Sequence, residues 1–571
     1  MMTFNPDELP RNYPRSFVPP QADLGDWEQI EPLLIQLERR PLDSVESLEG
    51  WLQNLSELGS TIGEEGAVRQ IRMTCQTDDP ELEKAYLHFI QEIEPRLKPY
   101  LHRLQQLYLA SPARQGLDLE RYRVWDRRTE NAVALYHEEN IPLQTEEQVL
   151  GQRYQKLTGA MTVEFDGRRQ TLQQMTRYLE ETDRPKRRQA WELVSERRLA
   201  DRQALDELYD QLLALRQRIA HNAGFANYRD YAFRALERFD YTPEDCLRFH
   251  QAVEQSAVPL LRRFQAERAD QLELESLRPW DLQVDPQGRP PLRPFDQAEE
   301  LIAGCQAILR QVSPDFGKEF QQMADLGLLE LESRVGKAPG GYQATLSEHR
   351  LPFIFMNAAG LDGDVRTLLH EAGHAFHTFA AREQFLGDYR HAPTEFSEVA
   401  SISMELLGGE QLEAFYSPEA AARSRREHLE RIANLLAWIA TIDAFQHWLY
   451  THPGHSPQER QAAWLELHRR FGGQESWQGY EEALGAVWQR QLHLYLVPFY
   501  YIEYGIAQLG ALGIWNHWQQ DHQAGLAAYR RALALGGSRS LPQLFEAAEL
   551  PFDFGAATVA TAIKGIEARL A

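Results

Sequence analysis

The segment from Leu368 to His377 constrains this chain most, because it places two imidazoles and a carboxylate on one apolar stretch. It reads His-Glu-x-x-His, and residues four apart lie on one face of a helix about one turn on. His370 and His374 can therefore reach one cation, with Glu371 beside them as a non-ligand. Apolar neighbours predict a mostly buried helix, for which Asp364 is a candidate N-cap. An ordinary buried helix with two hydrogen-bonded histidines is the alternative.

A second helical pattern, residues 394–407, offers a third ligand. A catalytic zinc takes three protein groups and leaves its fourth position to water. The metzincin pattern is excluded, because His377 and Ala380 occupy the places where it needs glycine and histidine. Glu398 and Glu405 share a face of this second helix among apolar residues, which indicates that they point at something charged rather than at solvent. The sequence predicts Glu398 as the third ligand and Glu405 as a hydrogen-bond partner of a ligand imidazole.

Several segments of the chain match one family pattern when they are taken together. They are residues 278–282 (Arg-Pro-Trp-Asp-Leu), 352–357 (Pro-Phe-Ile-Phe-Met-Asn), 370–377, 396–401 (Phe-Ser-Glu-Val-Ala-Ser) and 498–504 (Pro-Phe-Tyr-Tyr-Ile-Glu-Tyr). The combination resembles the oligoendopeptidase F branch of the thimet oligopeptidase family of zinc metallopeptidases. The resemblance runs from about residue 150 to the C-terminus and is weaker before it. It implies a mostly α-helical fold, in which two helical lobes flank a deep substrate channel and a small β-sheet lies next to the zinc-binding helix.

The resemblance also implies a cofactor and a reaction. One zinc ion per chain is expected on His370, His374 and Glu398. Glu371 is expected to take a proton from the zinc-bound water as that water attacks a peptide carbonyl, and then to pass it to the leaving amine.

Further groups are implied at the oxyanion of the intermediate, which needs donors beyond the metal. The resemblance points to His493, Tyr501 and Tyr504, and the two tyrosines are three apart, so one helical face can present both. Aligning His493 with the family's histidine shifts the tyrosines by one residue, which leaves Tyr500 as an alternative. Core packing is the ordinary role of a single tyrosine.

The expected function is a zinc-dependent endopeptidase that hydrolyses internal bonds of short or unfolded oligopeptides. One alternative is a zinc carboxypeptidase on a similar helical scaffold, which needs a cationic group for the terminal carboxylate of its substrate. The other is a catalytically inactive helical interaction scaffold. The complete His370, Glu371, His374 and Glu398 set argues against the inactive scaffold.

Composition narrows the partners and the compartment. The formal net charge of −24 over 571 residues argues against nucleic acid and anionic membranes as partners. Three scattered cysteines do not form a disulfide framework, which suits a reducing cytoplasm. The N-terminus shows no signal-peptide pattern, and no apolar run is long enough to span a membrane. We therefore expect a cytoplasmic peptidase, while the sequence leaves its oligomeric state open.

The order of patterns along the chain predicts two domains. Residues 1–195 are expected to form an N-terminal helical domain with a small hairpin near 162–171, and residues 196–571 the catalytic domain. One long amphipathic helix is predicted over about 187–223. Residues 342–346 and 351–356 are the strand candidates, and they lie just before the zinc helix. They predict either an exposed edge that binds an extended peptide or a buried structural hairpin.

Overall fold

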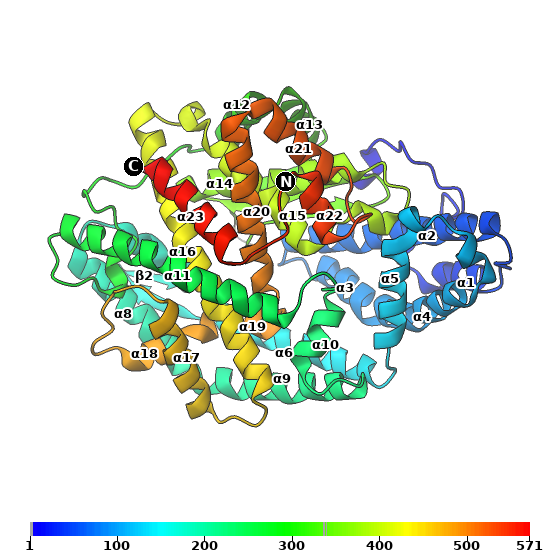
Figure 1. Cartoon of the computed structure of the whole chain (residues 1–571), viewed down its shortest axis with the longest axis horizontal. Helices are drawn as coiled ribbons and strands as arrows, with labels where there is room; N and C mark the ends of the chain where they lie inside the picture. Colours follow the sequence, from blue (N-terminus) through cyan, green and yellow to red (C-terminus); the bar gives the residue numbers. More distant parts are fainter. Residues whose placement is uncertain (1–3, 335–336, 339, 571) are drawn as a thin grey trace. The chain divides into compact units, whose positions relative to one another are not determined.

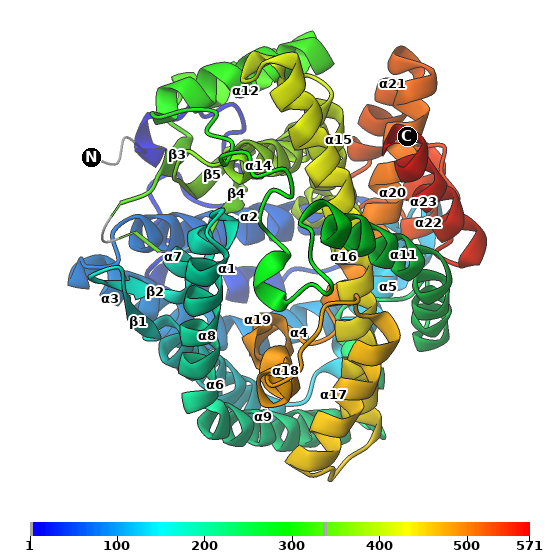
Figure 2. The same ribbon diagram turned by 90° about the vertical axis from the view of Figure 1, so that its left-hand side faces the viewer.

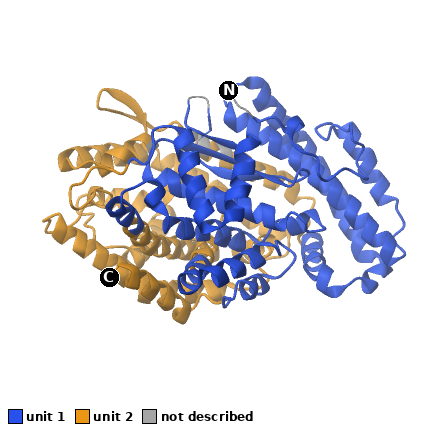
Figure 3. Cartoon of the chain, turned by 90° about the horizontal axis from the view of Figure 1, so that it is seen from above, with its two compact units in different colours: residues 1–134, 293–425, 510–552 blue, residues 135–292, 426–509, 553–571 orange. Residues whose placement is uncertain are grey.

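The computed structural model describes residues 4–334, 337–338 and 340–570 and is mostly helical (Figures 1 and 2). The chain divides into two compact units, each assembled from separate stretches (Figure 3). Unit 1 comprises residues 1–134, 293–425 and 510–552, and unit 2 comprises residues 135–292, 426–509 and 553–571. The predicted boundary between two contiguous domains, at residue 195, falls within unit 2. That boundary therefore stays a prediction.

Unit 1 begins with helices that enclose their own apolar core, in which Trp51 and Tyr108 are buried and stacked. Its helices are α1 (Trp27–Glu38), α2 (Val45–Cys75), α3 (Pro80–His88), α4 (Glu94–Ala110), α12 (Ala298–Val312), α13 (Pro314–Asp325), α14 (Asp362–Ala381), α15 (Thr394–Gly409), α21 (His522–Leu533) and α22 (Leu541–Ala547). Its short helical segments are the π-helix η2 (Phe89–Ile93) and the 3-10 helices η1 (Pro6–Glu8), η3 (Pro112–Gly116), η6 (Gly387–Arg390) and η7 (Leu412–Ala414). Three helices contain a boundary between the units: α5 (Leu119–Leu135), α16 (Pro418–Thr451) and α20 (Tyr501–Gln520).

A small sheet supports the central helix of unit 1. Its strands are β3 (Leu329–Glu332), β4 (Tyr342–Leu346) and β5 (Leu351–Ala358), in the order β3-β5-β4. Figure 2 shows these strands beside α14, and both β4 and β5 contact that helix. β4 and β5 were predicted, whereas β3 was missed because it pairs in parallel with a strand distant in sequence. The mostly helical fold with a small sheet next to the α14 helix is confirmed.

Local signals set the start of α14 and α15. α14 begins at Asp362 with Leu361 as its N-cap, so the prediction of Asp364 as N-cap is wrong. Asp364 lies in the first turn instead, where its carboxylate accepts the backbone N–H of Leu361 at 2.9 Å, which is one half of a capping box. α15 begins at Thr394 after Pro393, as predicted.

Unit 2 is also helical. Its helices are α6 (Asn140–Gly159), α7 (Leu172–Met175), α8 (Arg184–Ala200), α9 (Arg202–Asn222), α10 (Tyr228–Ala235), α11 (Pro243–Gln271), α17 (Pro457–Phe471), α18 (Glu481–Ala486), α19 (Leu492–Leu496) and α23 (Ala556–Leu570). Its short turns are η4 (Thr176–Glu180), η5 (Pro279–Asp281) and η8 (Val487–Arg490). The hairpin consists of β1 (Thr162–Phe165) and β2 (Arg168–Thr171), joined by Asp166 and Gly167 at positive φ.

The single helix predicted over residues 187–223 is divided into two helices, α8 and α9. The pattern over 187–223 breaks at Asp201, whose backbone leaves the helical region and separates α8 from α9. The Asp201 carboxylate accepts from Arg197 at 2.6 Å, so its side chain is held where α8 ends. Within the described ranges of the chain, the helices are too short or too polar to serve as membrane spans.

Candidate active site

The predicted ligands converge in unit 1, where α14 and α15 pack against each other. The Nε2 atoms of His370 and His374 lie 3.5 and 3.7 Å from Oε2 of Glu398. Glu398 is buried, and Ser401 one turn further along α15 donates to its Oε2 at 3.0 Å. Two imidazoles and a carboxylate therefore meet at one point, as the sequence predicts.

The spacing of these atoms suits a zinc ion. Ligand atoms around a tetrahedral zinc lie about 3.3–3.6 Å apart, because each bond to nitrogen or oxygen is about 2.0–2.2 Å long. The distances from both histidines to Glu398 are close to that range. The donor set of two imidazoles and one carboxylate is also one that catalytic zinc sites use. The residues present thus fit the metal that the sequence implies.

Glu405 fixes the orientation of one imidazole. Its Oε1 accepts from Nδ1 of His370 at 2.7 Å, which leaves Nε2 directed at Glu398. Such a partner sets the tautomer and makes the ligand nitrogen more basic. The predicted hydrogen bond between Glu405 and a ligand imidazole is therefore present.

Burial and charge set the protonation of the cluster without a metal. Burial lowers the pKa of His374 to about 4, which keeps its imidazole neutral and able to bind a metal. Burial also lowers the pKa of His370, but the hydrogen bond and charge of Glu405 outweigh it and raise this pKa to about 9. Burial raises the pKa of Glu371 to about 7, against the charge of His370. In the cluster without a metal, the carboxyl of Glu371 therefore titrates near neutral pH.

Gly373 allows α14 and α15 to approach closely enough for this geometry. A Cβ atom at this position would lie 2.6 Å from both the Ala400 carbonyl oxygen and Ser401 Cα, backbone atoms that cannot rotate away. Glu398 is on the same stretch of α15, so the missing Cβ helps to set its distance to the histidines. The sequence prediction missed this residue, although an isolated glycine in an apolar helix is a signal of close approach.

Gly373→Ala is therefore expected to push α15 away from α14. We expect the free energy of unfolding to fall by about 1–3 kcal/mol, the usual cost of overpacking, and metal content to fall with it. Denaturant unfolding and elemental analysis measure the two effects. Gly363→Ala is the matched control, because a Cβ there meets nothing within 4 Å. A Gly373→Ala protein with unchanged stability and metal would show that the helices tolerate wider spacing.

The residues predicted for the oxyanion cluster in unit 2. The ring of His493 lies 4.9 Å from that of Tyr501 and 5.9 Å from those of Tyr500 and Tyr504. Tyr501 is buried, and this burial raises the pKa of its hydroxyl to about 12. Tyr500 and Tyr504 are partly exposed. The structure thus brings all four rings together and leaves Tyr500 and Tyr504 more accessible than Tyr501.

Comparison with known families identifies the chain. The model described as Peptidase family M3 matches residues 177–559, more than half of the sequence. The chain belongs to peptidase family M3. The Peptidase M3 N-terminal domain also matches, over residues 21–136. The cluster of His370, His374 and Glu398 falls inside the first match.

Solved structures and curated relatives place the chain near the oligoendopeptidase F members of family M3. A putative oligoendopeptidase F superposes with a TM-score of 0.90 at 28% identity, covering 97% of this chain and 98% of the other. PZ peptidase A with an inhibitor gives 0.90 at 27% identity, with the same coverage. Oligopeptidase PepF of Bacillus subtilis is 23% identical over 49% of this chain, and chromosomal oligoendopeptidase F of Lactococcus lactis subsp. cremoris is 27% identical over 32%. These matches span only 42% and 28% of the two relatives' lengths. The predicted resemblance is confirmed.

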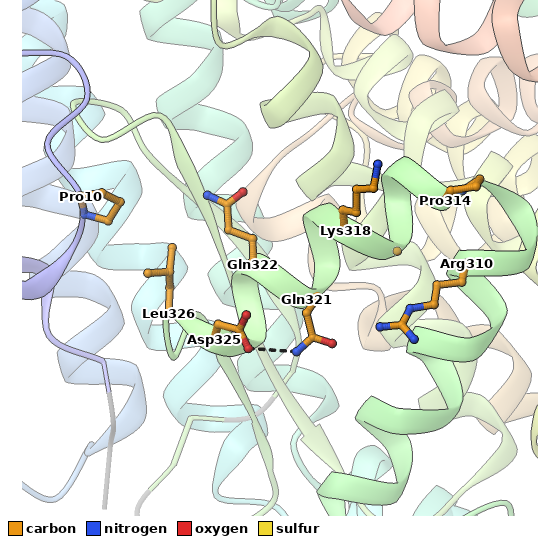
Figure 4. Close-up of a pocket in the computed structure, with 9 residues that line it drawn as sticks. Pro10, Arg310, Pro314, Lys318, Gln321, Gln322, Asp325 and Leu326 are labelled. Atoms are coloured by element: carbon orange, nitrogen blue, oxygen red, sulfur yellow. Dashed lines mark hydrogen bonds between the residues drawn. The ribbon is translucent and has the colours of Figure 1, made fainter.

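Two other features of this family M3 chain lie outside the cluster of His370, His374 and Glu398. His377 is buried on α14, its Nε2 has no hydrogen-bond partner among the residues described, and it is not part of the ligand group. A surface hollow of unit 1 is lined by residues such as Arg310, Lys318 and Gln321 of α12 and α13 (Figure 4). Gln321 donates to Asp325 at 2.9 Å there. This hollow contains none of the predicted site residues.

Proposed function

We propose that this protein is a zinc-dependent endopeptidase that hydrolyses internal bonds of short or unfolded oligopeptides. The observation that carries the proposal is the convergence of His370, His374 and Glu398 on one point, with Glu371 adjacent on the same helix. Family M3 membership and the oligoendopeptidase F structures support it. One zinc ion at this site is part of the proposal.

Zinc, when bound, acidifies water and polarises a peptide carbonyl. His370, His374 and Glu398 would hold it, and Glu405 orients His370 through the hydrogen bond to Nδ1. Glu371 acts as general base: it takes a proton from the attacking water and delivers it to the amine nitrogen that leaves. Its burial supports this role, because a buried carboxylate gains a proton more readily than an exposed one.

The edge of the sheet is the proposed binding place for the substrate backbone. β4 is an outer strand of the sheet. The backbone of Gln343 within it lowers the pKa of the Glu371 carboxyl through a hydrogen bond, against the effect of burial. A peptide bound in extended form beside such a strand gains main-chain hydrogen bonds without a preference for side chains. That arrangement requires an unfolded substrate segment.

His493, Tyr501 and Tyr504 are proposed to support the oxyanion, and Tyr504→Phe tests this role. The substitution removes one hydroxyl and almost no volume, so folding and metal content should hardly change. Loss of one oxyanion donor lowers kcat by roughly 100-fold, or about 3 kcal/mol, with little change in KM. Steady-state kinetics on one fluorogenic peptide, with Tyr501→Phe and Tyr500→Phe alongside, identify which hydroxyl acts. If all three variants match the wild type, these tyrosines serve packing alone.

The function is tested on a pool of unstructured peptides with acetylated N-termini and amidated C-termini. We expect internal cleavage by mass spectrometry, which a chelator abolishes and added zinc restores. Blocked ends exclude a carboxypeptidase, because that enzyme requires a free terminal carboxylate. A second pool of the same peptides with free ends is tested alongside. Cleavage of this pool alone would favour the carboxypeptidase, and no cleavage of either pool would favour an inactive scaffold. A folded protein that contains one cleaved sequence should survive, and its efficient cleavage would contradict the preference for unfolded substrates.

The proposed setting is the cytoplasm. Cys75, Cys246 and Cys305 are free and buried, which fits a reducing compartment. The net charge of −24 supports peptide substrates over nucleic acid.

A further inference from the structure

A second group of metal-ligating side chains lies in unit 2, away in sequence from the proposed active site. Cys246 and His250 are four residues apart on α11, and Asp443 and His447 are four residues apart on α16. Residues four apart share one helical face, so each helix presents a pair. Figures 1 and 2 show α11 beside α16, and His250 Nε2 hydrogen-bonds Asp443 Oδ2 at 2.8 Å.

The ligand atoms of this group are close together. Cys246 Sγ, a carboxylate oxygen of Asp443 and a ring nitrogen of His447 all lie within 4.8 Å of one another. His447 Nε2 is 3.4 Å from Asp443 Oδ2, a separation that ligands of one zinc ion have. Cys246 and Asp443 are fully buried and His447 is nearly so. A contraction of about 1 Å around Cys246, within the reach of side-chain rotation, gives zinc-bond distances.

Two atoms of these buried groups have no hydrogen-bond partner. Within the described part of the chain, His447 Nδ1 and Asp443 Oδ1 make no hydrogen bond, and His447 Nε2 has only the 3.4 Å ion-pair contact with Asp443 Oδ2. A buried polar group without a partner is costly, and a buried carboxylate more so. One cation between α11 and α16 would give the His447 imidazole a partner and would lie beside Asp443 Oδ2. His250 would keep its hydrogen bond to that same oxygen and so orient the carboxylate.

The surroundings favour an ion whose charge is balanced by its ligands. The His447 ring lies 6.0 Å from that of Phe233 and 5.5 Å from that of Phe499, while His250 contacts Phe471 at 6.4 Å. A divalent cation with one thiolate and one carboxylate is neutral, which an apolar shell tolerates. Burial raises the pKa of the Cys246 thiol, and the charge of Arg238 opposes this rise. The Arg238 guanidinium is itself paired with Glu503 at 2.9 Å.

We propose that unit 2 holds a buried zinc ion on three protein ligands, Cys246, Asp443 and His447, with His250 as hydrogen-bond partner of Asp443. Sulfur, nitrogen and oxygen donors together are typical of zinc. On binding, Cys246 gives up its thiol proton to solvent and a zinc–sulfur bond forms, with no change of oxidation state. The ion links α11 to α16, and it raises the expected metal content from one to two zinc ions per chain.

Cobalt(II) substitution in the full-length protein tests this site separately from the active site. A thiolate ligand gives cobalt(II) an intense near-ultraviolet charge-transfer band, and the cluster of unit 1 contains no cysteine. Protein expressed with cobalt should show this band in the wild type and in His374→Ala. The Cys246→Ser variant should lose the band. Cys305→Ser is the matched control, because Cys305 is equally buried but lies in α12 of unit 1, outside the proposed site, so this variant should keep the band.

Metal content and melting complete the test. Elemental analysis should give two metal ions in the wild type and one each in His374→Ala and Cys246→Ser. Stripping the metal from His374→Ala should lower its Tm. A cobalt protein without the band, a band that survives Cys246→Ser, or a metal-free His374→Ala protein would overturn the proposal. The last outcome would mean that a protonated histidine balances Asp443 instead. If Cys246→Ser does not fold, the wild-type spectrum and the His374→Ala metal content still decide.

Discussion

Glu371→Gln is expected to keep its metal and to lose turnover by about 10²–10⁴-fold, the usual contribution of a general base. The substitution replaces one carboxylate oxygen with an amide and preserves shape, so the ligands His370 and His374 keep their places. The amide cannot accept the proton of the attacking water. Single-turnover kinetics on a fluorogenic peptide, together with elemental analysis of the same sample, separate lost chemistry from lost metal.

Glu319→Gln is the matched control for this prediction. Burial raises the pKa of Glu319 to about 7, as it does that of Glu371, but Glu319 lies on α13 and outside the ligand cluster. Its substitution should leave turnover unchanged. Wild-type turnover in Glu371→Gln would remove Glu371 from the mechanism, and loss of metal in that variant would make it a ligand.

His374→Ala is expected to contain one metal ion fewer than the wild type and to have no measurable turnover. Loss of a ligand should weaken binding by more than the about 10–100-fold that loss of an outer hydrogen-bond partner costs. Glu398 would also lose the imidazole that faces it at 3.7 Å. Elemental analysis of matched preparations measures the difference, which holds whether or not unit 2 carries its own ion.

His377→Ala is the control on the same helix. His377 is buried like its neighbours but lies outside the ligand group, so its variant should keep the metal while stability falls through the cavity created. A His374→Ala protein with full wild-type metal would rule out the proposed ligand set. Loss of metal in His377→Ala at unchanged folding would add this residue to it.

Local patterns were predicted most reliably. β4 has the predicted bounds 342–346, β5 begins at the predicted residue 351, and α15 begins at the predicted residue 394. Helical periodicity and start signals involve residues within one or two turns, so the sequence alone contains them. One error is local too: a polar residue, Asp201, separates α8 from α9 although the apolar pattern continues.

The sequence by itself determined the chemistry available on α14 and α15, because the spacing of His370 and His374 on one helix, and of Glu398 and Glu405 on the other, dictates which side chains share a helical face. The tertiary structure decided what meets across elements that are distant in the chain. Gly373 sets how closely α15 approaches, β3 pairs in parallel with β5, and Cys246 meets His447 across some two hundred residues. Such contacts depend on packing between helices and strands, which no periodicity within a single segment encodes.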